Sequence, residues 1–180
     1  RFGVKTGMQI WEAQRLCPQI ILVNGDSDKY LETTKRFLNI LKDYSPYLEV
    51  FSIDEAFLEV TVRGPVSSQP HSMSSLRCHP FTVAEGMAQE IKSRIRSEIG
   101  EYISCSTGIS YNKLMAKLAG SLIKPDGLVV IANEKEAMKV LETQPLDEIC
   151  GIGHRIKKRL NKMGVFNFKD LRKVPRFLLL

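Results

Sequence analysis

Two adjacent acidic residues, Asp54 and Glu55, interrupt a stretch from Val50 to Val60 that otherwise has the pattern of an apolar β-strand. Neighbouring side chains of a strand point to opposite faces. The two carboxylates can therefore serve one site only where the backbone bends, most simply in a hairpin turn. An Asp-Glu pair suits a two-residue turn poorly, because the central residues of such a turn need positive φ angles. Mg²⁺ prefers oxygen ligands of this kind. The pattern predicts either a strained turn that holds Mg²⁺ or a solvated turn between two strands.

A second group of residues, around Gly151 and Gly153, has the composition of a phosphate-binding site. The two glycines flank one apolar residue between two predicted helical segments, which is the helix-hairpin-helix pattern. They let the backbone approach a phosphate closely, and the unpaired N–H groups that begin the next helix carry a partial positive charge. Gly164 is predicted to cap the end of that helix. The residues predicted to contact DNA are Gly151, Gly153, Arg155, Lys157 and Lys158.

The charge of the chain is concentrated at its C-terminal end. From residue 151 onward there are nine Lys or Arg residues and one acidic residue, a net charge of +8. The first 150 residues contain 17 basic and 19 acidic residues, a net charge of −2. This asymmetry favours a polyanionic partner, with nucleic acid as the leading candidate. The alternative is a solvated basic helix face.

Composition limits the class of protein. The chain has 180 residues, of which 43% are hydrophobic and 26% charged, and no apolar stretch approaches the length of a membrane span. Four widely separated cysteines without a Cys-x-x-Cys pair disfavour a disulfide framework and a zinc site. The chain begins at Arg1 without a signal segment. We therefore expect a fragment of an intracellular, cytoplasmic protein, associated with the nucleoid in a bacterium or located in the nucleus of a eukaryote.

Local patterns predict the elements that position the first site. A capping box at Thr6 begins a short helix that Pro18 ends, and residues 20–23 are expected to form a buried strand. Asp26 or Ser27 caps a long helix with one apolar face, which ends at residues 45–46. The strand, turn and strand around the acidic pair follow, and we expect this hairpin to lie against the long helix.

The remaining elements follow an irregular, Pro- and Ser-rich surface loop at residues 63–80. A capping box at Thr82 begins a helix that runs to Gly100, and a strand is expected at 103–109. Later elements are a helix opening at 111–113, a turn at 124–127, a strand at 128–131 and a helix capped by Asn133. We predict an α+β sheet layered with helices on one face, followed after Pro145 by a second, mostly helical domain.

These motifs together resemble the Y-family translesion DNA polymerases, of the DinB/UmuC-like type. The resemblance rests on ordered strings at residues 2–8, 52–56, 108–117, 124–127 and 151–153, and it covers most of the chain outside the 63–80 loop. It implies the end of a fingers domain at 1–18, a ferredoxin-like palm at 19–144 with an antiparallel sheet, and the start of a truncated helix-hairpin-helix thumb at 145–180.

The resemblance also implies roles for single residues. Asp54 is similar to the family aspartate that bridges two Mg²⁺ ions, and Glu55 to the glutamate that helps to hold one of them. Lys124 is similar to a lysine that contacts the incoming triphosphate, although a surface lysine before a turn is the alternative. Lys113 and Lys117 lie four residues apart on one helix face, so contact with substrate and exposure to solvent both stay open.

The same resemblance implies parts that this sequence does not contain. A first metal-binding aspartate and the fingers Tyr and Arg would precede Arg1, and Asp26 and Asp28 cannot replace that aspartate. The isolated chain is therefore expected to lack activity. The implied partners are primer-template DNA, deoxynucleoside triphosphates and a sliding clamp bound through missing C-terminal parts, with no membrane partner.

Three other functions fit part of the pattern. A catalytically dead relative used as a scaffold would be expected to lose the acidic pair, which this chain keeps. A non-catalytic helix-hairpin-helix protein that binds DNA in repair explains the basic C-terminal third, but it leaves the acidic hairpin without a purpose. A nucleotide cyclase on a related palm does not explain the two glycines at 151 and 153.

Overall fold

The computed structural model describes residues 2–60 and 80–179. Its α-helices are α1 (Ile10–Leu16), α2 (Ser27–Lys42), α3 (Pro80–Arg94), α4 (Lys113–Leu122), α5 (Glu134–Thr143), α6 (His154–Lys162) and α7 (Phe168–Lys173). Its strands are β1 (Leu48–Val50), β2 (Ala56–Leu58), β3 (Thr107–Ser110) and β4 (Leu128–Ile131). A π-helical turn η1 (Ile95–Ile99) extends α3, and the 3-10 turns are η2 (Leu146–Glu148) and η3 (Arg176–Leu178). The predicted 63–80 loop lies outside the described residues except for Pro80, where α3 begins.

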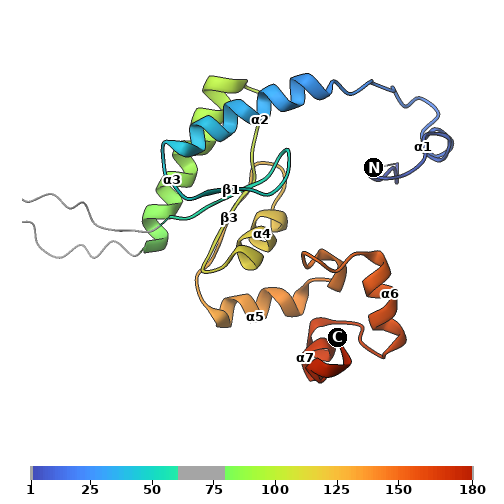
Figure 1. Ribbon diagram of the computed structural model, residues 1–180. Helices are drawn as coiled ribbons and strands as arrows, with labels where there is room; N and C mark the ends of the chain where they lie inside the picture. Colours follow the sequence, from blue (N-terminus) through green and yellow to red (C-terminus); the bar gives the residue numbers. More distant parts are fainter. Residues whose placement is uncertain (1, 61–79, 180) are drawn as a thin grey trace, which may run out of the picture.

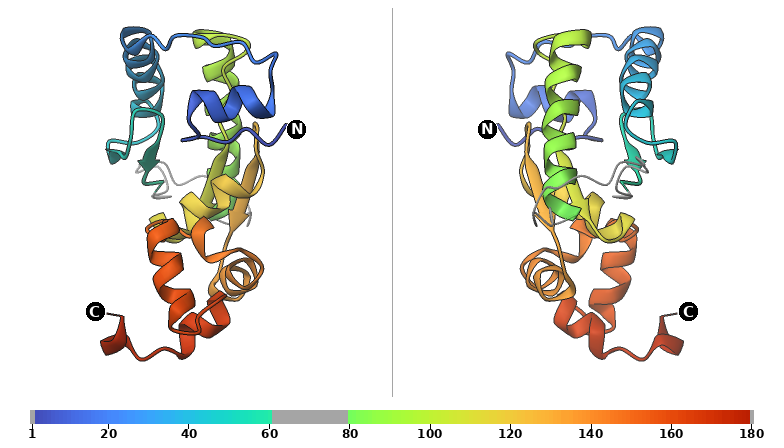
Figure 2. Two further views of the ribbon diagram at one scale, coloured as in Figure 1. Left: turned by 90° about the vertical axis from the view of Figure 1, so that its right-hand side faces the viewer. Right: turned by 90° about the vertical axis from the view of Figure 1, so that its left-hand side faces the viewer.

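The elements are arranged from one end of the molecule to the other. Helices α2 and α3 lie at one end, α5, α6 and α7 lie at the opposite end, and β3, β4 and α4 lie between them (Figure 1). The views in Figure 2 agree with this order. The result is the predicted α+β class. Within the described residues, no helix is both long enough and apolar enough to cross a membrane.

The strands form two separate pairs. Strands β1 and β2 are antiparallel, with Val50 opposite Ala56, whereas β3 and β4 are parallel, with Thr107 opposite Leu128. The expectation of a purely antiparallel sheet is therefore wrong for the described residues. The reason is that helix α4 connects β3 to β4, and a helical crossover returns the chain in the same direction.

Helix α4 approaches strand β3 very closely at Gly108. A Cβ atom at this residue would lie 2.0 Å from the carbonyl oxygen of Ala116 and 2.3 Å from the backbone nitrogen of Gly120. Only glycine leaves room for that approach. Asn112 begins the helix as predicted, because its Oδ1 accepts a hydrogen bond of 2.9 Å from the backbone N–H of Met115.

Helix α2 carries the predicted apolar face and supports the hairpin. Asp26 caps it by accepting hydrogen bonds from two backbone N–H groups of the first turn. Ile40 is 4% exposed and packs with Ile91 and Ile95, and Leu58 of the hairpin joins this cluster. Tyr30, in the first turn of the helix, is 55% exposed and does not join this cluster. The predicted contact between hairpin and helix is confirmed.

Residues 20–23 do not form the predicted buried strand. They have no regular secondary structure, and Ile21 and Val23 are 84% and 85% exposed. A strand requires a neighbour for its backbone N–H and C=O groups, and none of the described strands pairs with this segment. Helix α1 begins at Ile10, after Thr6, and its first turn is closed by Glu12, whose Oε2 accepts from the N–H of Gln9 at 3.2 Å.

The next two elements also begin at other residues than predicted. Helix α3 already includes Thr82, which therefore does not cap it. Strand β3 begins at Thr107, four residues after the predicted start, and Ile103 is 40% exposed. By contrast, Asn133 caps α5 as predicted, accepting 3.0 Å from the N–H of Glu136, and β4 has the predicted bounds.

The largest core joins α4, β4 and α5 to the C-terminal helices. Its buried members include Met115, Ile131, Leu141, Leu146 and Leu160. Pro145 itself is exposed, but Leu141 before it and Leu146 after it belong to the same hydrophobic cluster, so the helices after it pack on the same core as those before it. Cys17, Cys105 and Cys150, which lie among the described residues, are free.

Candidate active site and nucleic-acid interface

The acidic pair lies in a five-residue loop, Phe51 to Glu55, between β1 and β2. The backbone N–H groups of Phe51 and Ser52 both donate to the carbonyl oxygen of Glu55, at 2.9 and 3.1 Å. Neither Asp54 nor Glu55 has a positive φ angle. The prediction of a strained two-residue turn is therefore wrong, because a longer loop closes the hairpin without left-handed residues.

One hydroxyl group brings the two carboxylates together. Ser52 Oγ donates to Asp54 Oδ1 at 2.6 Å, and it lies 3.5 Å from Glu55 Oε2. Asp54 is exposed, whereas Glu55 is half-buried. The loop thus directs both side chains toward one point, as the sequence interpretation required.

A lysine of α4 holds Glu55. Lys117 Nζ lies 2.5 Å from both carboxylate oxygens of Glu55 and 4.7 Å from the centre of the Phe51 ring. Lys113, one helical turn earlier, forms an ion pair with Glu49 on β1. Both lysines therefore face the hairpin. The side chain of Lys113 is also 62% exposed to solvent, one of the two alternatives left open by the spacing, and contact of either lysine with substrate stays a prediction. The spacing shows that they share a helix face, but partners more than 60 residues away leave no local signal.

Two of these residues, Asp54 and Glu55, are candidates for part of a site for a hard cation. Asp54 fits such an ion, because its exposed carboxylate accepts one hydrogen bond from a neutral hydroxyl and has free lone pairs. Glu55 fits it only when Lys117 releases an oxygen. Among residues 2–60 and 80–179 there is no cluster of three or more His, Cys, Asp or Glu side chains that could hold a metal ion. Asp54 and Glu55 are thus two candidate ligands without a third in the described residues.

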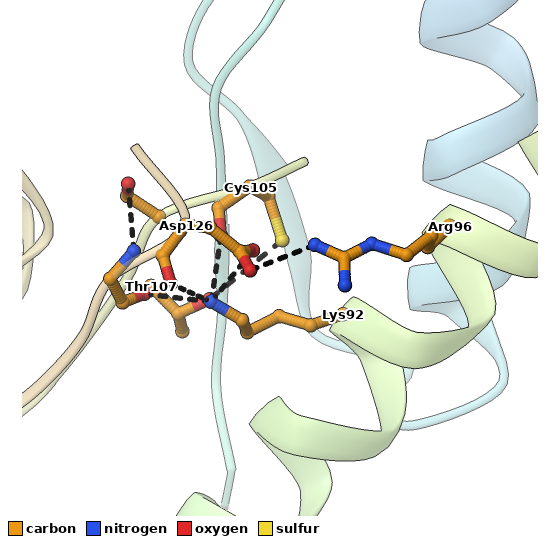
Figure 3. A network of polar contacts seen from close by, with 7 residues as sticks. Lys92, Arg96, Cys105, Thr107 and Asp126 are labelled. Carbon is orange, nitrogen blue, oxygen red and sulfur yellow. Dashed lines mark hydrogen bonds and ion pairs between the residues drawn. The ribbon is translucent and has the colours of Figure 1, made fainter. Parts of the chain in front are cut away.

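Lys124 lies in the turn between α4 and β4, and its side chain is exposed. The turn is bound by a polar network that sequence reasoning missed (Figure 3). Lys92, and to a smaller extent Arg96, hold the pKa of Asp126 below its usual range. Burial raises the pKa of the nearby Cys105 thiol. These contacts of Lys92 join residues 13 to 35 positions apart, so no local pattern in the sequence indicated them.

The two glycines of the basic region have different structural roles. Gly151 has φ +93°, a left-handed conformation that glycine alone adopts without strain, whereas Gly153 has φ −80° and precedes α6. A Cβ atom at either glycine would meet nothing within 4 Å, so the space beside the turn is open. Ile152, the apolar residue between the two glycines, packs on the core, and Gly164 has the predicted left-handed C-terminal position with φ +80°.

The basic residues of α6 differ in their availability. Arg155 and Lys158 are exposed, whereas Lys157 Nζ forms an ion pair of 2.6 Å with Asp147 Oδ1 and thereby holds the pKa of that carboxyl below its usual range. Of the two apolar residues four positions apart that were both expected to pack this helix, Leu160 is 6% exposed and anchors it, whereas Ile156 is 43% exposed.

Comparison with known proteins identifies the family of the chain. Residues 1–121, which include the hairpin and most of α4, match the model of the impB/mucB/samB family. The chain belongs to the impB/mucB/samB family. DNA polymerase IV of Pelotomaculum thermopropionicum is 38% identical over 173 residues, covering 96% of the chain and 39% of the relative. DNA polymerase IV of Moorella thermoacetica is 38% identical over 174 residues, covering 97% and 39%.

Solved structures agree with this family assignment. The chain is similar to an insertion ternary complex of Dbh DNA polymerase, with a TM-score of 0.78 and 31% identity over 99% of the chain and 47% of the solved one. DinB from Sulfolobus solfataricus gives a TM-score of 0.78 and 31% identity, covering 99% and 48%. This chain therefore spans about two fifths to one half of the length of these family members.

Proposed function

We propose that this chain is part of a DNA-directed DNA polymerase of the translesion type. Such an enzyme transfers a deoxynucleotide from its triphosphate to the 3′-hydroxyl of a primer and copies damaged DNA. One observation carries the proposal: in a member of the impB/mucB/samB family, the hairpin loop directs Asp54 and Glu55 toward one point, within reach of the same hydroxyl. The DNA polymerase IV relatives support it. The activity is that of the whole protein, of which the chain covers a part.

In this proposal Asp54 and Glu55 hold two Mg²⁺ ions together with groups outside the described residues. Bound Mg²⁺ lowers the pKa of an attacking hydroxyl and offsets the charge that develops on a leaving pyrophosphate. Asp54 contributes an exposed carboxylate. Lys117 pairs with Glu55 and neutralises it when no metal ion is bound, so that two adjacent anions are not left unbalanced.

Lys124 binds the triphosphate of the incoming nucleotide in the same proposal. An ammonium group on a flexible stem suits several phosphate oxygens, because it acts as a point charge with three donors. Its side chain is exposed, and in the described part of the chain it has no hydrogen-bond or ion-pair partner that an anion would need to displace.

The C-terminal helices bind the DNA backbone. Gly151 and Gly153 provide open space at the start of α6, and Arg155 and Lys158 provide charge. Contacts of this kind recognise shape and charge, and they weaken with salt by a slope of about −0.9 per phosphate neutralised on duplex DNA. Lys157 can bind a phosphate only after its ion pair with Asp147 breaks, so it is the weakest of the proposed contacts.

We also infer the division into the end of a fingers domain at 1–18, a ferredoxin-like palm at 19–144 and the start of a helix-hairpin-helix thumb at 145–180. In this division the antiparallel β1–β2 pair and the separate parallel β3–β4 pair both belong to the palm. A sliding clamp is a further proposed partner, which other parts of the whole protein would bind. The whole protein would act in the cytoplasm, at the nucleoid or in the nucleus.

Primer extension by the full-length protein tests the proposed function. We expect Mg²⁺-dependent extension of a primed template by the wild-type protein and almost none by the Asp54→Ala variant. Equal extension by both would refute the role of the hairpin. If neither protein extends the primer but both bind DNA with the same salt dependence, the second candidate, a DNA-binding scaffold in repair, is correct instead. The open, basic start of α6 favours that candidate.

A further inference from the structure

The turn that carries Lys124 is bound by a lysine from another helix. Lys92 of α3 is 15% exposed, and its Nζ donates to the carbonyl oxygens of Asp126, Gly127 and Cys105 at 2.5, 3.1 and 3.1 Å. It also forms an ion pair of 3.0 Å with Asp126 Oδ1. Figure 3 shows how these groups surround the ammonium group. An ammonium has three N–H donors, so these acceptors satisfy it completely.

The backbone that Lys92 binds has an energetically unfavourable conformation. Asp126 has φ +58°, and within residues 2–60 and 80–179 it is the one residue other than glycine with a positive φ. Gly127 is equally constrained, because a Cβ atom there would lie 2.1 Å from the carbonyl oxygen of Ile123. The turn therefore folds back tightly on the end of α4, and Lys92 stabilises it from α3.

The same network neutralises the anion that is nearest to Lys124 in the sequence. Lys92 binds Oδ1 of Asp126, and Arg96 binds Oδ2 at 2.9 Å. Two residues earlier, Lys124 is exposed and unpaired with any of the described residues. Because both oxygens of Asp126 are occupied by other cations, its carboxylate does not draw the ammonium group of Lys124 away from an anionic ligand.

We propose that Lys92 is a positioning residue for the triphosphate of the incoming nucleotide, acting through the turn that presents Lys124. It fixes the backbone of that turn and occupies the carboxylate of Asp126. A buried apolar side chain at this position would pack α3 against the turn equally well, but it would do neither of these things. The inference rests on the proposed function, in which Lys124 binds the triphosphate.

A double-mutant cycle in the full-length protein tests the inference. The four proteins are wild type, Lys92→Met, Lys124→Ala and the double variant, and the readout is single-nucleotide incorporation at varied triphosphate concentration. We expect Lys92→Met to raise KM for the triphosphate about tenfold and to change kcat less than about twofold. In the Lys124→Ala background it should raise KM no further. Lys92→Arg, which keeps the charge and the donors, should restore most of the affinity.

The outcomes separate the two proposals. If Lys124→Ala leaves KM unchanged, Lys124 does not bind the triphosphate, and both its proposed role and the inference are overturned. If Lys124→Ala raises KM but Lys92→Met raises it equally in both backgrounds, Lys92 has a structural role only and the inference alone is overturned. If urea-unfolding measurements show that Lys92→Met does not fold, Lys92→Gln replaces it in the same cycle. Gln keeps amide donors for the carbonyl groups but not the charge. Its effect on KM should likewise be absent in the Lys124→Ala background.

Discussion

In the proposed metal site Lys117 competes with the ion for Glu55, so removal of Lys117 is expected to strengthen metal binding by this chain. The substitution Lys117→Met keeps an unbranched apolar stem beside Phe51 and removes the ammonium that lies 2.5 Å from both Glu55 oxygens. A divalent cation that binds Glu55 must displace that ammonium. The change therefore lowers the dissociation constant for the metal, unlike most substitutions near a binding site.

The size of this effect follows from the exposure of the pair. The side chains of Lys117 and Glu55 are 27% and 42% exposed, so solvent screens the ion pair partly. Ion pairs of this type contribute about 1 kcal/mol, which corresponds to about fivefold in a binding constant. We expect Lys117→Met to bind Mn²⁺, used as a spectroscopic substitute for Mg²⁺, about fivefold more tightly than the wild-type chain.

The assay is titration of free Mn²⁺ by electron paramagnetic resonance with the purified chain. Lys113→Met is the matched control, because it removes the same charge from the same helix face but from the partner of Glu49. It should change Mn²⁺ binding less than about twofold. Glu55→Gln should weaken binding. If Glu55→Gln weakens binding while Lys117→Met leaves it unchanged or weaker, Lys117 is a supporting ligand holder rather than a competitor, and the reasoning is refuted.

Three further predictions concern stability and DNA binding. Gly108→Ala should lower the free energy of unfolding by about 3 kcal/mol in urea titrations, because the added Cβ would overlap the backbone of α4. Gly86→Ala is the control, since a Cβ atom there, in the middle of α3, would meet no atom within 4 Å, and it should be neutral or stabilising. Equal effects of the two substitutions would contradict the packing argument. Because Lys92 lowers the pKa of Asp126, that carboxyl stabilises the fold above the usual aspartate pKa of about 3.9, and this stability is lost as the pH falls below it. Urea titrations from pH 6 to 2 should therefore show a shallower acid loss for Asp126→Asn, and an identical acid loss would refute the assignment. Lys158→Ala should weaken duplex DNA binding equally for all sequences and reduce the magnitude of the salt slope by about 1, whereas a sequence-selective loss would speak against a backbone contact.

Elements whose signals are local were predictable from the sequence. Asp26, Asn112 and Asn133 cap helices where their side chains suggested, since a cap depends on residues within one helical turn. Strand β4 likewise has its predicted bounds, because turn residues directly precede this short apolar run and mark where it begins. The sequence also predicted that a hairpin would carry the acidic pair.

Features that depend on distant partners were not predictable. Residues 20–23 have a strand-like composition but pair with no described strand, and β3 pairs in parallel because of the crossover helix. The binding of Glu55 by Lys117 and of the 124–127 turn by Lys92 joins residues 62 and up to 35 positions apart. Alternation and capping patterns contain no information about such contacts, because they describe only the face or end of a single element.

The loop at the acidic pair combines a feature that the sequence predicted correctly with one that it predicted wrongly. The presence of two carboxylates at a bend was visible in the sequence, and Ser52 proves to connect them. The strained turn that seemed to require a ligand does not exist, since neither residue has a positive φ. The case for a metal site therefore rests on convergence of the carboxylates and on family membership, and backbone strain plays no part in it.

Single-turnover nucleotide incorporation by the full-length protein tests the central claim, that the hairpin carboxylates are catalytic. The comparison is between Asp54→Asn and Glu49→Gln, which remove one charge each from the same hairpin, the first at the loop and the second on β1. We predict that Asp54→Asn lowers the incorporation rate about a thousandfold at saturating Mg²⁺ and triphosphate, while Glu49→Gln stays within about threefold of wild type. Equal rates for the two variants would contradict the account.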